Sequence, residues 1–281
     1  MAVTSVGRDA RLRARVAAGL LALAGRALPV SPGEERPLLR DPGRFNWFGH
    51  EERCIAAGVP TPLDCERAPG RILRAAREVP GLEIAAIGPL TNLARALALE
   101  PDLPDRVGGV TIMGGHLREA RLGERVAPPG IDYNLCSDPE AAVAVLGAGF
   151  RITLVTADVT LATWMRESDL ARLERAGPVA RELARQVRLW TPVQRRVFTQ
   201  MGGTLAPDNA AYLHDPLTLL SLVDASPLLF EDLRIVPTIE DGVMRTREVP
   251  ADSGLGGAMR AATAVDAEAA RAAIVERLLR L

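Results

Sequence analysis

The sequence contains no lysine, and aromatic residues, cysteines and histidines are scarce. All 34 of its basic residues are arginines, and 35 acidic residues bring the formal net charge to −1. A chain without a basic excess has little electrostatic support for nucleic-acid binding. The three cysteines form no CxxC pattern and are odd in number, which is typical of a protein from the reducing cytoplasm rather than of a disulfide framework.

Long apolar runs are absent as well. No segment reaches the roughly 20 apolar residues that a membrane helix requires, so we predict no membrane partner. A short apolar run at 20–24 follows the arginine-rich residues 11–15 and superficially resembles a signal peptide. Because Gly25 and Arg26 interrupt this run and apolar residues recur at helical spacing, we interpret 9–25 as an amphipathic helix of a cytoplasmic protein.

What the sequence does contain is a hydrophobic share of 48% over 281 residues, enough for a substantial core. Apolar runs that suit strands alternate with helical patterns over nearly the whole length. This alternation predicts a single α/β domain over 1–281, with a mostly parallel central sheet and helices on both faces. The expected elements are strands at 2–6, 28–30, 82–87, 109–113 and 151–155, helices at 9–25, 68–78, 90–99, 138–146, 162–177, 178–200, 216–223 and 267–280, and a hairpin at 232–248 that turns at Asp241-Gly242.

A histidine stands beside an acid at His214-Asp215, immediately before Pro216. Histidine is the side chain that titrates near neutral pH, and the chain has only three. An aspartate before a proline is typical of a helix N-cap, an interpretation that also covers Asp138 before Pro139. Capping does not require a histidine, however, and aspartate is also a hard oxygen donor for Ca²⁺ or Mg²⁺. Both interpretations stay open for Asp215.

Two earlier segments lie where a strand gives way to a helix, which is where open α/β sheets bind ligands. In the first, residues 88–89 (Gly-Pro) allow a sharp turn and free the carbonyl groups of Leu90 and Thr91 to bind something, unless this is an ordinary turn. In the second, Asp132 and Asn134 point to the same face if the segment is extended. Such a pair is either a clamp for sugar hydroxyl groups or part of a polar surface loop.

Other residues have two interpretations each. Met113, before Gly114-Gly115, offers a soft apolar wall to a ligand or belongs to the core. The long loop at 31–66 is a functional lid or plain surface packing. A lone loop histidine such as His50 is more often incidental than a substrate contact. The loop also contains the aromatic residues Phe45, Trp47 and Phe48.

Taken together and in this order, the segments resemble the inosine-uridine-preferring nucleoside hydrolase family. Residues 2–30 also look like that family's second strand and following helix, so the resemblance covers essentially the whole chain. The matching words are Gly88-Pro89-Leu90-Thr91-Asn92-Leu93-Ala94, Met113-Gly114-Gly115, Asp132-Tyr133-Asn134, Asp138-Pro139-Glu140-Ala141-Ala142, Asp158-Val159-Thr160 and Leu213-His214-Asp215-Pro216.

The resemblance implies a nucleoside-hydrolase-like fold with a Rossmann-like core, and hydrolysis of the N-glycosidic bond of a ribonucleoside to ribose and a free base. It implies Ca²⁺ as the cofactor, with the carboxylate of Asp215 and the main-chain carbonyl of Thr91 as ligands. Family relatives commonly form dimers or tetramers, so a homo-oligomer is expected.

The resemblance also implies which residues bind the nucleoside. Asn134 and Asp132 would bind the ribose, with Met113 nearby. His214 would lie on the base side, where it would protonate or steer the leaving group of an oxocarbenium-like transition state. Further base contacts are expected from 41–66 and 185–212, including Trp190, Phe198 and Tyr212.

The sequence departs from the family where the family carries an Asp-x-Asp-x-x-x-Asp-Asp word at the end of its first strand. That word supplies the general base and most Ca²⁺ carboxylates. The first strand and helix are therefore expected to be missing, and the Ca²⁺ site to be incomplete, since Ca²⁺ takes about 6–8 oxygens. Losing a central strand would expose strand edges, which predicts marginal stability or association. Arg8 also stands in place of an expected asparagine, and Asp132 in place of an expected glutamate.

Two hypotheses of different classes remain. The first is a nucleoside hydrolase, and the second is a non-catalytic nucleoside- or ribose-binding protein, a degenerate member of the family. Release of ribose from inosine or uridine would distinguish them. A dinucleotide enzyme is disfavoured because no G-x-G-x-x-G follows a first strand.

Overall fold

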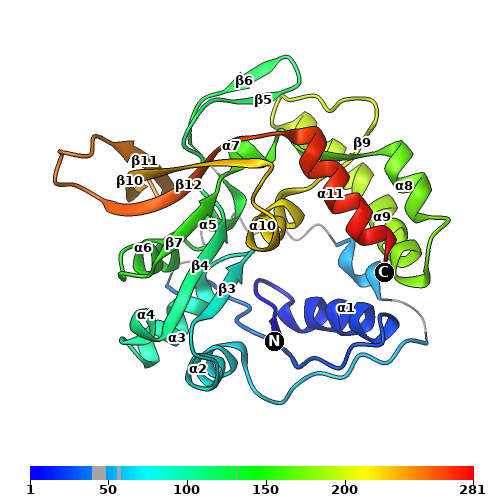
Figure 1. Ribbon diagram of the computed structural model, residues 1–281, viewed down its shortest axis with the longest axis horizontal. Helices are drawn as coiled ribbons and strands as arrows, with labels where there is room; N and C mark the ends of the chain where they lie inside the picture. Colours follow the sequence, from blue (N-terminus) through cyan, green and yellow to red (C-terminus); the bar gives the residue numbers. More distant parts are fainter. Residues whose placement is uncertain (40–48, 56–57, 131) are drawn as a thin grey trace.

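The computed structural model describes residues 1–39, 49–55, 58–130 and 132–281 (Figure 1). At its centre lies a six-stranded sheet with the strand order β11-β10-β12-β7-β4-β3. Strands β3, β4, β7 and β12 run parallel, whereas β10 is antiparallel to both β12 and β11. The predicted mostly parallel α/β sheet is therefore confirmed. Its strands are β3 (Leu82–Ala86), β4 (Val107–Met113), β7 (Ile152–Val155), β10 (Leu228–Glu240), β11 (Val243–Val249) and β12 (Gly257–Val265).

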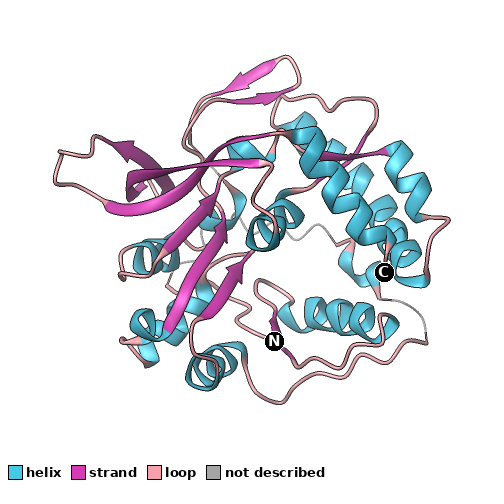
Figure 2. Cartoon of the chain, viewed as in Figure 1, coloured by secondary structure: helices cyan, strands magenta, loops and turns pink. Residues whose placement is uncertain are grey.

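Helices lie on both faces of this sheet (Figure 2). Side chains alternate between the two faces along a strand, so Leu154 packs in one core cluster and its neighbour Val155 in the other. The helical elements are α1 (Ala10–Leu23), η1 (Glu51–Cys54), α2 (Ala68–Glu78), α3 (Thr91–Leu99), α4 (Leu103–Arg106), α5 (Tyr133–Ser137), α6 (Pro139–Leu146), α7 (Ala157–Thr160), α8 (Glu167–Leu173), α9 (Pro178–Gln200), α10 (His214–Val223) and α11 (Ala267–Leu279).

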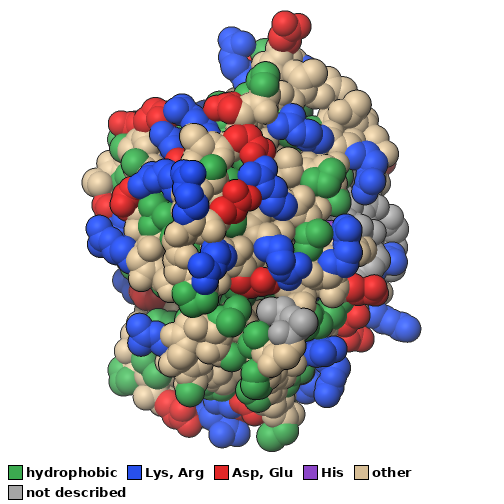
Figure 3. Space-filling view, turned by 90° about the vertical axis from the view of Figure 1, so that its right-hand side faces the viewer, with side chains coloured by type: hydrophobic (Ala, Val, Ile, Leu, Met, Phe, Trp, Pro, Cys, Tyr) green, Lys and Arg blue, Asp and Glu red, His purple; other side chains and the backbone are tan. Residues whose placement is uncertain are grey.

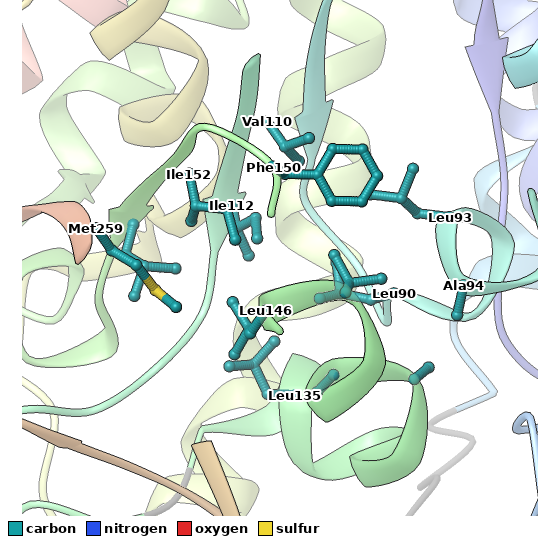
Figure 4. Packing of buried hydrophobic residues seen from close by; sticks show 14 of the residues in the cluster. Leu90, Leu93, Ala94, Val110, Ile112, Leu135, Leu146, Phe150, Ile152 and Met259 are labelled. Carbon is teal, nitrogen blue, oxygen red and sulfur yellow. The ribbon is translucent and has the colours of Figure 1, made fainter. Parts of the chain in front are cut away.

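The two core clusters hold the ends of the parallel strands in place. The first lies between the sheet and helices α3, α5 and α6. Figure 4 shows Leu90, the N-cap residue of α3, with Ile112 of β4 and Leu146 of α6 within it. The second joins β7 and β12 to α8–α11. Since β4 and the start of α10 are anchored in separate clusters, their relative position depends on the whole sheet rather than on one local contact.

A separate two-stranded parallel sheet is formed by β1 (Val3–Thr4) and β2 (Val30–Ser31), with α1 as the crossover between them. Asp9 caps α1 by accepting a hydrogen bond from the backbone N–H of Leu12. The helix expected at 9–25 is thus confirmed. Among the described residues, β3 pairs with β4 alone and β1 with β2 alone, so each has an unpaired outer edge.

The hairpin is confirmed, whereas one predicted helix is shorter than expected. Asp241 and Gly242 adopt φ values of 50° and 75° at the β10–β11 turn, as a tight two-residue turn requires. The helix expected over 162–177 begins only at Glu167, because β8 (Trp164–Arg166) pairs antiparallel with β9 (Asn209–Tyr212). A cross-strand ladder here outweighs local helical propensity.

None of the described helices combines the length and apolarity needed to cross a membrane. On the face shown in Figure 3, arginine and acidic side chains intermingle, which agrees with the balanced charge of the sequence. Phe45, Trp47 and Phe48 lie outside the described residues, so the lid over this part of the loop stays a prediction. A single domain over the whole chain also stays a prediction.

Candidate active site

A cavity of about 740 Å³ opens where β3 and β4 end and where α5 and α10 begin. This is the edge at which parallel α/β sheets bind ligands, and the volume suits a small molecule. The lining also includes residues of β1, η1 and α9. Among the predicted site residues, the cavity is lined by Met113, Asp132, Asn134, His214 and Asp215.

Asp132 and Asn134 lie together, but not on one extended segment as predicted. Asp132 is extended (φ −112°, ψ 162°) and caps α5 by accepting a hydrogen bond from the backbone N–H of Leu135 at 2.9 Å. Asn134 already belongs to the helix, and its Nδ2 donates to the carbonyl oxygen of Met113 at 3.0 Å. The extended clamp is therefore wrong, because the carboxylate of Asp132 satisfies the helix start.

The amide of Asn134 is fixed on one side only. Its Nδ2 also lies 3.2 Å from the sulfur of Met113, whereas no described residue hydrogen-bonds to its Oδ1. Burial raises the pKa of Asp132, and backbone hydrogen bonds from Leu135, Gly115 and Asn134 oppose that rise. The free oxygen of Asn134 is thus the group best placed to accept a hydrogen bond from a ligand.

His214 is the first residue of α10, and its ring is held on two sides. Its Nδ1 lies 2.6 Å from Oγ1 of Thr160, and its ring centroid lies 5.4 Å from that of Tyr212. Burial lowers the pKa of His214 to about 4, so the imidazole is neutral at pH 7. No described residue hydrogen-bonds to Nε2, on the other edge of the ring.

Asp215 follows within the first turn of α10, whose N-cap is Leu213. The capping interpretation of Asp215 is therefore wrong. Its carboxylate has no hydrogen bond or ion pair with any described residue, and burial raises its pKa to about 7. A recessed carboxylate without a partner is costly for the fold, which makes Asp215 a functional candidate on physical grounds.

Thr91 does not line this cavity. It is the first residue of α3, it is 1% exposed, and its hydroxyl group donates to Oδ2 of Asp138 at 2.6 Å. Residues 87–90 and Asn92 form the cavity wall at this turn instead. Asp138 caps α6 as predicted, by accepting a hydrogen bond from the backbone N–H of Ala141. Metal ligation by the carbonyl of Thr91 stays a prediction.

The cavity lining also contains aromatic rings. Phe198 and Tyr212 stack with centroids 4.9 Å apart, and Trp190 lies 4.9 Å from the ring of His50. All four line the cavity, so His50 lies at the site although a lone loop histidine is more often incidental. His50 also lies 3.1 Å from the carboxylate of Glu51. Thr160, which the sequence marked only as part of a matching word, is the second residue that sequence reasoning missed.

The described residues do not complete a Ca²⁺ site. They contain no group of three or more His, Cys, Asp or Glu side chains placed to hold a metal ion. Asp215 suits Ca²⁺ as one oxygen donor, but Ca²⁺ takes about 6–8 oxygens. Whether the chain binds Ca²⁺ stays a prediction.

A second cavity, of about 630 Å³, lies along β4, β7 and β12 beside α10. Its lining includes the charged residues Glu83, Arg151, Asp232 and Arg260, but none of the predicted site residues. The cavity at the strand ends is therefore the candidate active site.

Comparison with known proteins gives matches along nearly the whole chain. The sequence model of the family described as inosine-uridine preferring nucleoside hydrolase matches residues 1–276. The pyrimidine-specific ribonucleoside hydrolase RihA of Shewanella woodyi is 30% identical, over 75% of this chain and 65% of that protein. The probable uridine nucleosidase 2 of Arabidopsis thaliana is 29% identical, over 87% of this chain and 72% of that protein. The chain thus spans about two thirds of the length of the curated relatives that it matches.

Among solved structures, the purine-preferring ribonucleoside hydrolase from Gardnerella vaginalis superposes with a TM-score of 0.81. It is 20% identical, and the alignment covers 99% of this chain and 89% of that one. At this level of identity the likeness shows a common fold.

Proposed function

The chain belongs to the inosine-uridine preferring nucleoside hydrolase family, and we propose that it hydrolyses the N-glycosidic bond of ribonucleosides to give ribose and a free base. The observation that carries the proposal is the convergence of separate chain segments on one cavity. Its lining combines the oxygens of Asn134 and Asp215 with the rings of Trp190, Phe198 and Tyr212. A nucleoside likewise combines a polyhydroxylated sugar with a flat base.

The polar and the aromatic lining residues have different roles in this reaction. The transition state resembles an oxocarbenium ion, so positive charge develops on the sugar while negative charge develops on the base. Asn134 accepts a hydrogen bond from a ribose hydroxyl group, and the carboxylate of Asp215 stabilises the charge on the sugar. Asp132 holds the start of α5, and with it Asn134, in place.

His214 serves the leaving group. Its ring lies beside that of Tyr212. Among the described residues, none hydrogen-bonds to Nε2 of His214. A neutral imidazole with a proton on Nε2 donates a hydrogen bond to the departing base. Stacking of the base against the aromatic rings keeps it in line with that donor.

The resemblance to the family also leads us to propose Ca²⁺ as the cofactor. Asp215 would supply one of its ligands, and bound Ca²⁺ would supply charge at the ribose hydroxyl groups and the attacking water. Because the described residues leave this site incomplete, no step is assigned to the metal. We also propose a cytoplasmic location and a homo-oligomeric state.

The test is release of ribose. The protein is incubated with inosine or with uridine, with and without added Ca²⁺, and free ribose is measured against His214→Gln and Asp215→Asn variants. Turnover by the wild type that both variants lose supports the proposal. Saturable nucleoside binding without turnover supports the second candidate, a non-catalytic nucleoside-binding protein, which the absence of a complete carboxylate cluster among the described residues favours.

A further inference from the structure

We propose that Thr160 is a positioning residue whose hydroxyl group donates a hydrogen bond to Nδ1 of His214 and thereby keeps the imidazole proton on Nε2. The proposal rests on the proposed function, because Nε2 is the atom that would face the leaving base. It deepens that function by naming the residue that makes His214 a hydrogen-bond donor toward the cavity.

The geometry places the two ring nitrogens in different surroundings. Thr160 is the last residue of α7, is fully buried and does not line the cavity, whereas His214 does. Oγ1 of Thr160 lies 2.6 Å from Nδ1. Because Nδ1 and Nε2 lie on different edges of the ring, Nδ1 toward Thr160 leaves Nε2 on the side of the cavity.

The hydroxyl group of Thr160 has one proton and two possible acceptors. One is Nδ1 of His214 at 2.6 Å, and the other is the carbonyl oxygen of Ala157 at 3.3 Å. That carbonyl already accepts the backbone N–H of Leu161 at 2.9 Å. Nδ1 is the closer acceptor and has no other donor among the described residues, so we assign the hydroxyl proton to it. The opposite arrangement, with Nδ1–H donating to Oγ1 and the hydroxyl group donating to Ala157, is a result that would overturn the proposal.

An Nδ1 that accepts a hydrogen bond fixes the tautomer of a neutral imidazole, because the ring proton must then sit on Nε2. The ring of Tyr212, tilted by 36° against that of His214, restricts rotation of the imidazole. Thr160 and Tyr212 together therefore present one nitrogen, in one protonation form, to the cavity.

The first arm of the test reads the tautomer directly. The full chain is labelled with ¹⁵N-histidine, and its three histidines are assigned with His50→Gln and His116→Gln variants. Two-bond ¹⁵N–¹H spectra at pH 7 are expected to show His214 protonated on Nε2 in the wild type and in Thr160→Ser. In Thr160→Val the Nε2–H signature is expected to give way to a mixture of tautomers.

The second arm is kinetic, and Thr163 provides a matched control. It is 1% exposed, it lies three residues from Thr160, and its Oγ1 has no hydrogen-bond partner among the described residues. Thr160→Val is expected to lower kcat about tenfold and to change KM less than about twofold. The reason is that the hydrogen bond from Nε2 of His214 to the leaving base is lost in the transition state. Thr160→Ser is expected to restore most of kcat, and Thr163→Val to behave as the wild type.

Two results would overturn the proposal. One is wild-type His214 protonated on Nδ1, which is read from the wild-type chain once its three histidine signals are assigned. The other is Thr160→Val with an unchanged tautomer and an unchanged kcat. A wild type that releases no ribose would sink the proposed function, whereas the tautomer spectrum would still decide the role of Thr160.

Discussion

Asp138-Pro139 and Asp215-Pro216 are the same dipeptide at the start of two helices, α6 and α10, in very different surroundings. The carboxylate of Asp138 is fully buried and accepts hydrogen bonds from the hydroxyl group of Thr91 and from the backbone N–H groups of Leu38 and Ala141. That of Asp215 faces the cavity and has no partner among the described residues.

The difference shows that Asp138 contributes to the stability of the fold, whereas Asp215 lowers it. Three hydrogen bonds offset the cost of burying Asp138, so its presence needs no function beyond capping. Nothing described offsets the burial of Asp215, and its pKa is raised to about 7. A side chain that is kept at a cost to stability, and that faces a cavity, is where ligand chemistry is expected.

The largest expected effect is on catalysis. Asp215→Ala should lower kcat/KM for ribonucleosides at least about a thousandfold, because it removes the unpaired carboxylate that faces the sugar. Ribose release measures this effect, with thermal melting as the control for folding. Activity within tenfold of the wild type would show that Asp215 is not the group on which the reaction depends.

Asp138→Ala should act on stability instead. Three donors lose their acceptor, so the free energy of unfolding is expected to fall by about 3 kcal/mol. Urea denaturation measures the loss. The free energy of unfolding of Asp138→Asn, which keeps one acceptor oxygen, should lie between those of the wild type and Asp138→Ala. A fall smaller than that caused by Asp215→Ala would reverse the comparison between the two aspartates.

Asp215 should also make stability depend on pH. Its pKa is raised in the folded state, so the folded form holds its proton more tightly than the unfolded chain. The resulting stability is fully present below about pH 4 and is lost as the pH rises through about 7. Because the cavity admits water, we expect about 2 kcal/mol rather than the full effect of the shift.

Urea denaturation at pH 5 and pH 8 tests this expectation. The wild type should lose more stability than Asp215→Asn over this range, since the other raised carboxyl groups, Asp132 and Asp138, are common to both proteins. Parallel pH profiles for the two proteins would contradict the environment assigned to Asp215.

The smallest expected effect concerns Asn134. Asn134→Ala should raise KM for ribonucleosides about tenfold, because it removes the amide that meets the sugar. Ser137→Ala, on the same helix, removes a hydroxyl group whose hydrogen bonds go to Tyr133 rather than to Asn134, and should leave KM unchanged. Equal effects of the two substitutions would point to a change in α5 rather than to a lost contact.

Much of the fold follows from local pattern. The β10–β11 turn was predictable from Asp241-Gly242, and α1 from its helical spacing. The strand β12 was not predicted, because its alanine-rich sequence, Gly257–Val265, gains its strand conformation from pairing with β10 and β7. The segment at 162–166 was misjudged for the same reason.

The sequence motifs predicted which residues belong to the candidate site, but not which contacts these residues make. The words placed Asn134, His214 and Asp215 at strand-to-helix junctions, and the cavity lies there. Whether an aspartate caps a helix or faces a cavity depends on a shift of one or two residues in the helix start, as Asp138 and Asp215 illustrate. The partnership of Thr160 with His214 spans 54 residues, and no local pattern reports it.

The unpaired edges of β1 and β3 both border the cavity. Open strand edges recruit further strands unless they are shielded, and lysine is the residue most often used for shielding. A chain without lysine must use other charged side chains for that purpose, such as Glu83 on β3. The cavity that would admit a nucleoside is therefore also bordered by strands that can pair with a second copy of the chain.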